Sequence, residues 1–439
     1  LVAACGDDDD DDGAAETEAS TDTAGPVDTT AAAETTGATT ATEETTPSDG
    51  TEAAETTGTE AEGSGEPASG EPVKVMVISQ LDAPDFAFPE IEVMVKALAE
   101  SVNEDGGING QPIEIIACND QRDQNAAAAC AREAVSEEVV AVLGIFSIFG
   151  DSILPVLEAA GIPYVGNSIL GASDSSSPVA FPLDGGVVGN GAAIGLELAE
   201  SGCTGVGAIG YDNAASGLYM SWVQKGVEAG GATWVGDTRV PEGNPDYGPA
   251  VAALLGDGAD CAFLALPPAE AAKAAGAIGQ AGEPLKIGTG FTTLPQAVIS
   301  AVPAASTEGA VLTSANPNAS DTDFPGVQEA IDVATAHGAT DDDLAGSYAL
   351  TSWARAEVLF NAMQTIEGEI TAESVMEAMS SITDPGTPLL GTFSTTEEFP
   401  VEGFNRLFNF TYLTYNVTDQ TATLVTNEFK DASDTVREG

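Results

Sequence analysis

The sequence predicts an α/β fold of two doubly wound, Rossmann-like lobes preceded by a disordered acidic linker. Three observations lead to this prediction. Large apolar side chains are almost absent from residues 6–72, whereas short apolar runs alternate with segments of helical periodicity from residue 73 onward. This alternation occurs twice, on either side of a loop at 171–182. The chain beyond residue 72 is also too long for one core and fits two domains.

The segment 6–72 holds 20 Asp or Glu and no Lys or Arg. Such a chain buries too little apolar surface to offset the entropy of ordering, so we expect a flexible linker. A coil of this length spans about 45 Å, and repulsion between its carboxylates lengthens it. The linker therefore gives a folded domain room to move above a membrane.

Cys5 is the expected point of attachment to that membrane. It follows three small residues at 2–4, and the run Val-Ala-Ala-Cys resembles a bacterial lipobox, whose cysteine takes a diacylglycerol. Residues 1–5 are thus interpreted as the end of a lipoprotein signal. The expected location is the extracytoplasmic face of the cell membrane, with contact to the bilayer through the lipid.

The charge balance excludes nucleic acid as a partner. The chain carries 12 Lys or Arg against 70 Asp or Glu, and it has no basic cluster that would bind phosphates. No run of 18 apolar residues predicts a membrane span. We expect a monomer with no cofactor.

Four cysteines remain after Cys5, an even number that indicates disulfides in an exported protein. Spacing favours Cys118 with Cys130 and Cys203 with Cys261, although the sequence does not prove this connectivity. A zinc site is disfavoured because there is no Cys-x-x-Cys and only one histidine.

Apolar runs and helical periodicity define the elements in order. In the first unit we expect strands at 73–79, 113–117 and 139–144. We also expect one helix after residue 90 and a second at 124–135, which Asp123 caps. In the second unit the strands are 206–210 and 261–266, and the helices cover 190–200, 217–229, a segment from about 247, and 269–281. The chain then continues with helices at 343–366 and 371–382 and strands at 407–417 and 421–425.

This order predicts that the chain crosses between the lobes several times. We expect one lobe to comprise 73–182 with 314–403 and the other 183–313 with 404–439. The hinges then lie near Pro182, Ser314 and Phe404.

Several motifs resemble those of the type I periplasmic binding proteins of the branched-chain amino-acid branch. They lie at 106–110 (Gly-Gly-Ile-Asn-Gly), 112–114, 119–120, 139–144 and 155–163. The resemblance extends more loosely over 73 to about 425. It implies two lobes joined by three hinge crossings that close on a small ligand and deliver it to the permease of an ABC importer.

The resemblance also implies contact residues in the first lobe. The segment after strand 139–144 holds a serine that takes the ligand carboxylate in this family, and Ser147 lies closest to that position, with the Ile148 N–H beside it. An N-cap role for Ser147 is the alternative. The next contact segment includes Ser168, and Leu170 occupies the place of an expected threonine.

The second lobe lacks one expected contact. Tyr211 and Asp212 follow a strand and are candidate contacts, although Asp212 also fits an ordinary loop turn. Family members that bind amino acids place an acid after a later strand to pair with the ligand ammonium, but 287–291 contains none. Either another carboxylate supplies the charge or the ligand is not an α-amino acid. The other carboxylates considered are Asp82, Asp85 and Asp212, and the residues expected to wall an apolar pocket are Phe86, Phe88, Phe149 and Phe291.

The sequence thus favours a solute-binding lipoprotein for a branched-chain amino acid or a related amide or organic acid, and not an enzyme. The alternative is a lipid-anchored sensor or hydrolase with the same fold. A hydrolase would use Ser152 in Gly-Asp-Ser at 150–152, but a serine nucleophile needs a base, and nothing places His337 nearby.

Overall fold

The computed structural model describes residues 67–438, apart from 84–86, 397–398, 400 and 402. The predicted lipidation site Cys5 and nearly all of the predicted linker lie outside this part. The described chain forms two α/β lobes, each built on its own sheet. Within the described residues, no helix is long and apolar enough to cross a bilayer.

The first lobe contains a parallel five-stranded sheet in the order β2-β1-β3-β4-β5. Its strands read as continuous apolar runs because helices cover both faces, and Val75, Val77 and Leu143 are fully buried. The strands are β1 (Val73–Ser79), β2 (Ile113–Asn119), β3 (Ala141–Leu143), β4 (Tyr164–Val165) and β5 (Ala180–Phe181). The helices of this stretch are α1 (Glu90–Glu104), α2 (Gln124–Ser136), α3 (Gly150–Ala160) and the short η1 (Ser173–Ser175).

The second lobe contains an eight-stranded sheet in the order β12-β11-β10-β9-β8-β6-β7, with β13 paired to β11. Strands β6 to β10 are parallel, and β11 runs antiparallel to β10 and β12. The strands are β6 (Gly205–Tyr211), β7 (Thr233–Val240), β8 (Cys261–Ala265), β9 (Lys286–Gly290), β10 (Val311–Ser314), β11 (Thr411–Thr418), β12 (Thr421–Leu424) and β13 (Lys430–Asp431). The helices are α4 (Gly186–Glu200), α5 (Ala214–Ala229), α6 (Gly248–Gly256), α7 (Pro268–Ala281), α8 (Gln296–Ala301), α9 (Ala304–Thr307) and α14 (Ser433–Glu438).

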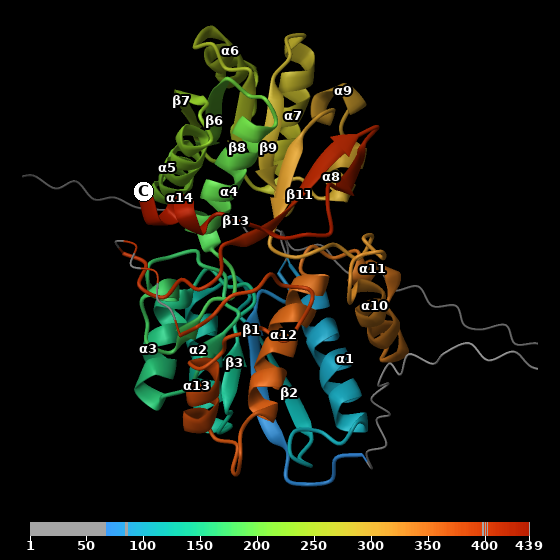
Figure 1. Cartoon of the computed structure of the whole chain (residues 1–439). Coiled ribbons are helices and arrows are strands. Elements are labelled where there is room, and N and C mark those ends of the chain that lie inside the picture. Colours follow the sequence, from blue (N-terminus) through green and yellow to red (C-terminus); the bar gives the residue numbers. More distant parts are fainter. Residues whose placement is uncertain (1–66, 84–86, 397–398, 400, 402, 439) are drawn as a thin grey trace, which may run out of the picture. The chain divides into compact units, whose positions relative to one another are not determined.

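The chain crosses between the lobes three times. It leaves the first lobe after β5, returns after β10 and leaves again before β11. The returning stretch adds helices to the first lobe, so α12, in orange in Figure 1, packs against α1 from the other end of the sequence. These helices are α10 (Val327–Ala336), α11 (Asp341–Leu344), α12 (Ala349–Gln364) and α13 (Ala372–Met379).

Two disulfides join neighbouring elements. Cys118 on β2 is bonded to Cys130 on α2, and Cys203 before β6 is bonded to Cys261 on β8. These are the two pairs that spacing favours. The only group of potential metal ligands among the described residues, Cys203 with Asp260 and Cys261, contains this second disulfide, so its sulfurs are not available to a metal.

Most predicted elements are confirmed to within a few residues, and the helix predicted over 343–366 is wrong. The structure breaks it into α11 and α12. The Glu90 side chain occupies the space beside Gly346, where a Cβ atom would lie 2.5 Å from the carboxyl carbon, and the Glu90 carboxylate accepts the Tyr348 N–H at 3.2 Å. This contact turns the backbone and lets a second helix begin at Ala349.

Candidate functional site

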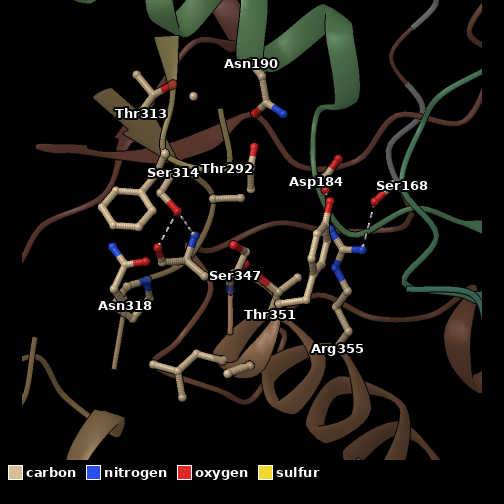
Figure 2. Close-up of a pocket in the computed structure, with 18 of the residues that line it drawn as sticks. Ser168, Asp184, Asn190, Thr292, Thr313, Ser314, Asn318, Ser347, Thr351 and Arg355 are labelled. Atoms are coloured by element: carbon tan, nitrogen blue, oxygen red, sulfur yellow. Dashed lines mark hydrogen bonds and ion pairs between the residues drawn. The ribbon is translucent and has the colours of Figure 1, made fainter. Parts of the chain in front are cut away.

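A cavity of about 200 Å³ lies at the junction of the two lobes (Figure 2). Five segments line it, and they come from both lobes and from the crossings between them. The segments are 168–170, 184–190, 290–292, 313–319 and 344–355, together with Tyr219 of α5. The cavity is therefore built from parts of the chain that only the three crossings bring together.

The topology explains why these segments meet. Segment 168–170 follows the carboxyl end of β4, and 290–292 and 313–319 follow those of β9 and β10. In open α/β sheets, ligands bind beyond the carboxyl ends of the strands. In Figure 2, Asn190 of α4 and Thr351 of α12 approach the cavity from opposite sides.

The only charged side chains in the cavity lining are Asp184 and Arg355, and they pair with each other. Their side chains are 11% and 3% exposed. One Asp184 oxygen accepts a hydrogen bond from the Arg355 guanidinium, and the other accepts one from the Gly186 N–H at 2.7 Å. The carboxylate is thus fully engaged, and the lining carries no net charge.

Arg355 also satisfies the ends of two strands in the first lobe. Its Nη1 donates to the carbonyl oxygens of Ile145, at 3.0 Å, and Gly166, and it lies 3.4 Å from the Ser168 hydroxyl. Gly166 has a φ of 68°, and a Cβ atom there would lie 2.9 Å from the Arg355 side chain. Glycine is therefore needed at 166 for both backbone conformation and space.

The remaining polar groups of the lining are neutral, and many are unbonded. Several polar side chains in the lining make no hydrogen bond to the described residues, among them Asn190, Tyr219, Thr292, Thr313, Ser347 and Thr351. Burial raises the pKa of Tyr219, and the nearby Asp184 charge adds to this rise. The Tyr219 phenol therefore stays protonated at physiological pH and is able to donate a hydrogen bond.

Two helices begin at the cavity. The first residues of α4 and α12 line it. Their N-cap residues make no side-chain cap bond, and at α4 the Asp184 carboxylate accepts only the first N–H, that of Gly186. The first N–H groups of an α-helix have no partner within the helix, and its N-terminus carries partial positive charge. A partly negative group in the cavity is therefore favoured over a positive one.

Apolar side chains complete the lining. Phe291 packs against Tyr415 with ring centroids 5.2 Å apart, and Leu170 is 40% exposed. The centroid of the Tyr348 ring lies 4.6 Å from that of Phe88 and 5.3 Å from that of Phe146. Its aromatic neighbours form a rigid layer behind one wall.

The structure brings three of the predicted contact residues into this lining, namely Ser168, Leu170 and Phe291. Ser147 does not line the cavity, because its buried hydroxyl donates to Asp120 at 2.6 Å and accepts the Phe149 N–H at 3.3 Å. Ile148 is 48% exposed outside the lining.

The other predicted contacts also lie elsewhere. Phe88 is buried in the layer behind Tyr348. Tyr211 ends β6 and Asp212 follows it, and neither lines the cavity; the Asp212 N–H donates to the Val240 carbonyl at 2.9 Å. Asp82 is exposed outside the lining, and Asp85 lies outside the described residues.

Sequence reasoning missed Asp184, Arg355 and Tyr219. One signal was available for Arg355, because it is the only Lys or Arg between 287 and 405. An isolated cation in an apolar helix indicates a buried ion pair. Nothing similar marks Asp184 in a chain so rich in acids. The histidine that a hydrolase would need, His337, lies against Glu100 and Glu104 of α1, whereas Ser152 is on α3.

Comparisons with known proteins agree with this architecture. A family model described as periplasmic binding protein matches residues 72–405. No curated protein sequence matches significantly. Many solved structures share the fold at low sequence identity.

Three of these structures are described as binding proteins. An ABC transporter substrate-binding protein from Sphaerobacter thermophilus has a TM-score of 0.68 at 19% identity, over 82% of this chain and 98% of its own. A solute-binding protein from R. palustris, in complex with 4-hydroxybenzoate, has a TM-score of 0.66 at 18% identity, over 82% and 97%. A leucine-binding protein from Thermotoga maritima has a TM-score of 0.63 at 17% identity, over 82% and 99%.

The buried ion pair generates a stability prediction. Arg355→Met is expected to lower the free energy of unfolding by about 3–5 kcal/mol, because it leaves the Asp184 carboxylate buried without its partner. The double variant Arg355→Met with Asp184→Leu should recover part of this loss. Urea unfolding measures both. Arg132→Met, at an exposed position, is the control and should change stability by less than about 0.5 kcal/mol. Wild-type stability in Arg355→Met would contradict this role.

Proposed function

Because the chain belongs to the type I periplasmic binding protein family, we propose that it is an extracytoplasmic solute-binding lipoprotein that captures a small ligand between its lobes. The members of this family bind solutes rather than catalyse reactions, and they work with ABC transporters. The proposed role is delivery of the ligand to the permease subunits of an importer. The observation that carries this proposal is the interlobe cavity, which is lined by unbonded polar groups.

The charge of the cavity supports a ligand without an ammonium group. Its one carboxylate, Asp184, is engaged by Arg355 and the Gly186 N–H, so no acidic side chain of the described lining is free to pair with a cation. Burying an unpaired ammonium costs several kcal/mol. Among branched-chain amino acids, related amides and organic acids, this favours the amides and organic acids.

The size and polarity of the cavity further narrow the class of ligand. A cavity of about 150 Å³ accommodates benzene, so this cavity admits a single ring or a branched chain with one or two polar substituents. Phe291 and Leu170 offer apolar surface, while the Thr351 and Tyr219 hydroxyls and the starts of α4 and α12 offer donors. We favour a small aromatic or branched carboxylate, a class that includes the 4-hydroxybenzoate bound by the R. palustris protein.

Capture is proposed to occur by closure of the lobes about hinges near Pro182, Ser314 and Phe404. Ligand binding would shift an equilibrium between open and closed forms that exists without it. Ile148, Leu170 and Leu218 support such a movement, since they are three of the five large apolar side chains that are substantially exposed in the described residues. They follow β3, β4 and β6 at the carboxyl ends of both sheets, where closure would remove them from water.

The ligand class is tested by thermal shift on the folded protein. Benzoates, branched 2-oxo acids and their amides are expected to raise the melting temperature, because ligand at 100 times its dissociation constant adds about 2.7 kcal/mol. Leucine, isoleucine and valine should have little effect. Stabilisation by these amino acids alone would contradict the ligand class.

Tyr219→Phe tests the cavity as the binding site. It removes a hydroxyl that has no protein partner, so stability should be unchanged while the ligand dissociation constant rises about fivefold, the effect of about 1 kcal/mol. Isothermal titration calorimetry measures this change. Tyr211→Phe, outside the lining, is the matched control. Equal affinity of the Tyr219→Phe and wild-type proteins would place the ligand elsewhere.

Lipid attachment at Cys5 is tested in cells that process lipoproteins. The precursor with its whole signal should incorporate labelled fatty acid and sediment with membranes, and Cys5→Ser should do neither. Tether length and charge are the same in both forms, so the difference isolates the cysteine. Membrane retention of Cys5→Ser would reject the lipid anchor.

A further inference from the structure

We infer that Asp174 is a positioning residue of the ligand cavity, and that its ionisation couples ligand affinity to the pH outside the cell. This inference rests on the proposed function for the cavity and for the location of the protein. Asp174 itself does not line the cavity. It acts through the loop of residues 167–171, which connects β4 to η1.

Asp174 holds this loop at three points. Its Oδ2 accepts the N–H groups of Leu170, at 3.0 Å, and Gly171, at 2.8 Å. Its backbone carbonyl accepts the Asn167 side-chain amide at 2.8 Å. Residues 168–170 between these points all line the cavity. The Leu170 end of that wall therefore depends on one carboxylate, whereas the Ser168 hydroxyl at the other end donates to the Ile145 carbonyl at 2.9 Å.

The surroundings of Asp174 leave it little freedom. Asp174 is 2% exposed, and its side chain packs against the start of α3 at Gly150. A Cβ atom at Gly150 would lie 1.9 Å from the Asp174 Oδ1, so glycine is required there for space rather than for backbone conformation. A side chain held this closely transmits a change in its own bonding to the loop.

The carboxylate is only half satisfied. Its Oδ1 has no hydrogen-bond partner among the described residues, and the same is true of the nearby Asn167 Oδ1 and Ser175 Oγ. Removing a carboxylate from water favours its neutral form. Burial raises the pKa of Asp174 to about 6, and the two N–H bonds to Leu170 and Gly171 oppose this rise.

Charges on the neighbouring elements add to this effect. Asp151 on α3 raises the pKa of Asp174 further, and its carboxylate also accepts the Ser173 hydroxyl. Four other titratable residues face this region: Glu158 on α3, Tyr164 on β4, Arg355 on α12, and Arg406. The Glu158 carboxylate accepts a hydrogen bond from the Ser177 hydroxyl, and the backbone N–H of Arg406 donates to the Ser175 carbonyl.

The direction of the pH effect follows from these contacts. At pH 7.5 Asp174 is mostly ionised, and at pH 5 it is mostly protonated. The raised pKa of Asp174 means that its buried site favours the neutral carboxyl over the charged one, although the two N–H bonds favour the charge. A loosened loop returns Asp174 to water and to its ordinary pKa, so the ordered loop is favoured in acid and loses stability as the pH rises through about 6. Ligand affinity should therefore rise as the pH outside the cell drops from 7.5 to 5.

Hydrogen exchange in the full chain tests the positioning role without any ligand. In the wild-type protein, the protection factors of the Leu170 and Gly171 amides should rise about tenfold between pH 7.5 and 5. Asp174→Asn, which resembles the neutral acid, should show high protection at both values. Asp342→Asn, at an exposed position, is the control and should behave as the wild type. Protection that does not change with pH in the wild type, or that keeps its pH dependence in Asp174→Asn, would overturn the inference.

Asp151→Asn provides a second variant should Asp174→Asn fail to fold. It removes a neighbouring negative charge while keeping an acceptor for Ser173, so the midpoint of the wild-type pH profile should move to lower pH. An unchanged midpoint would show that Asp174 is not the titrating group.

The coupling to ligand is measured with 4-hydroxybenzoate as the probe. Its dissociation constant for the wild type should fall several-fold from pH 7.5 to 5, and that for Asp174→Asn should change far less. If the loop responds to pH but the dissociation constant of the probe changes equally in the wild type and in Asp174→Asn, the coupling alone would be overturned. If the probe and the other carboxylates fail to bind at pH 7.5, the proposed function is rejected, and the exchange data still decide the role of Asp174.

Discussion

The buried pair of Arg355 and Asp184 is the interaction on which the rest of the site depends. Arg355 belongs to the stretch that returns to the first lobe, and Asp184 lies at the first crossing out of it. The guanidinium also binds the carbonyls of Ile145 and Gly166, after β3 and β4. One side chain therefore connects two strand ends, a hinge and a helix that arrive from distant parts of the sequence. Loss of either partner leaves a desolvated charge at the junction of the lobes.

The same pair sets the chemistry of the cavity. The chain has a formal net charge of −58, yet the lining contains only this neutralised pair and uncharged groups. The acidic exterior attracts cations in general, whereas the interior offers them no free carboxylate. Selection against cationic molecules would thus arise from desolvation inside the cavity, where it opposes the long-range attraction. Hydroxyls such as Thr351 would then orient the ligand once water is excluded.

The sequence predicted the fold more completely than the site. Strand and helix periodicity, the Asp123 cap and the cysteine spacing are local signals, and each depends on residues close together in the chain. The break at Gly346 depends on Glu90, more than 250 residues away, so helical periodicity alone missed it. The cavity contacts at Ser168, Leu170 and Phe291 follow strand ends, where topology alone indicates them. Asp184 and Arg355 acquire their role only when the lobes are assembled, and resemblance directed attention to Ser147 instead, whose hydroxyl is engaged by Asp120.

The proposed ligand is a small carboxylate without an ammonium group, held in the cavity between Tyr219 and Thr351. A crystal structure of the protein grown with 4-hydroxybenzoate is the decisive measurement. We expect density for the ring beside Phe291, with polar atoms within hydrogen-bond distance of Thr351 or Tyr219. Density at Ser147 and Asp212 with an empty cavity would contradict it, as would a co-purified amino acid whose ammonium is paired with a carboxylate.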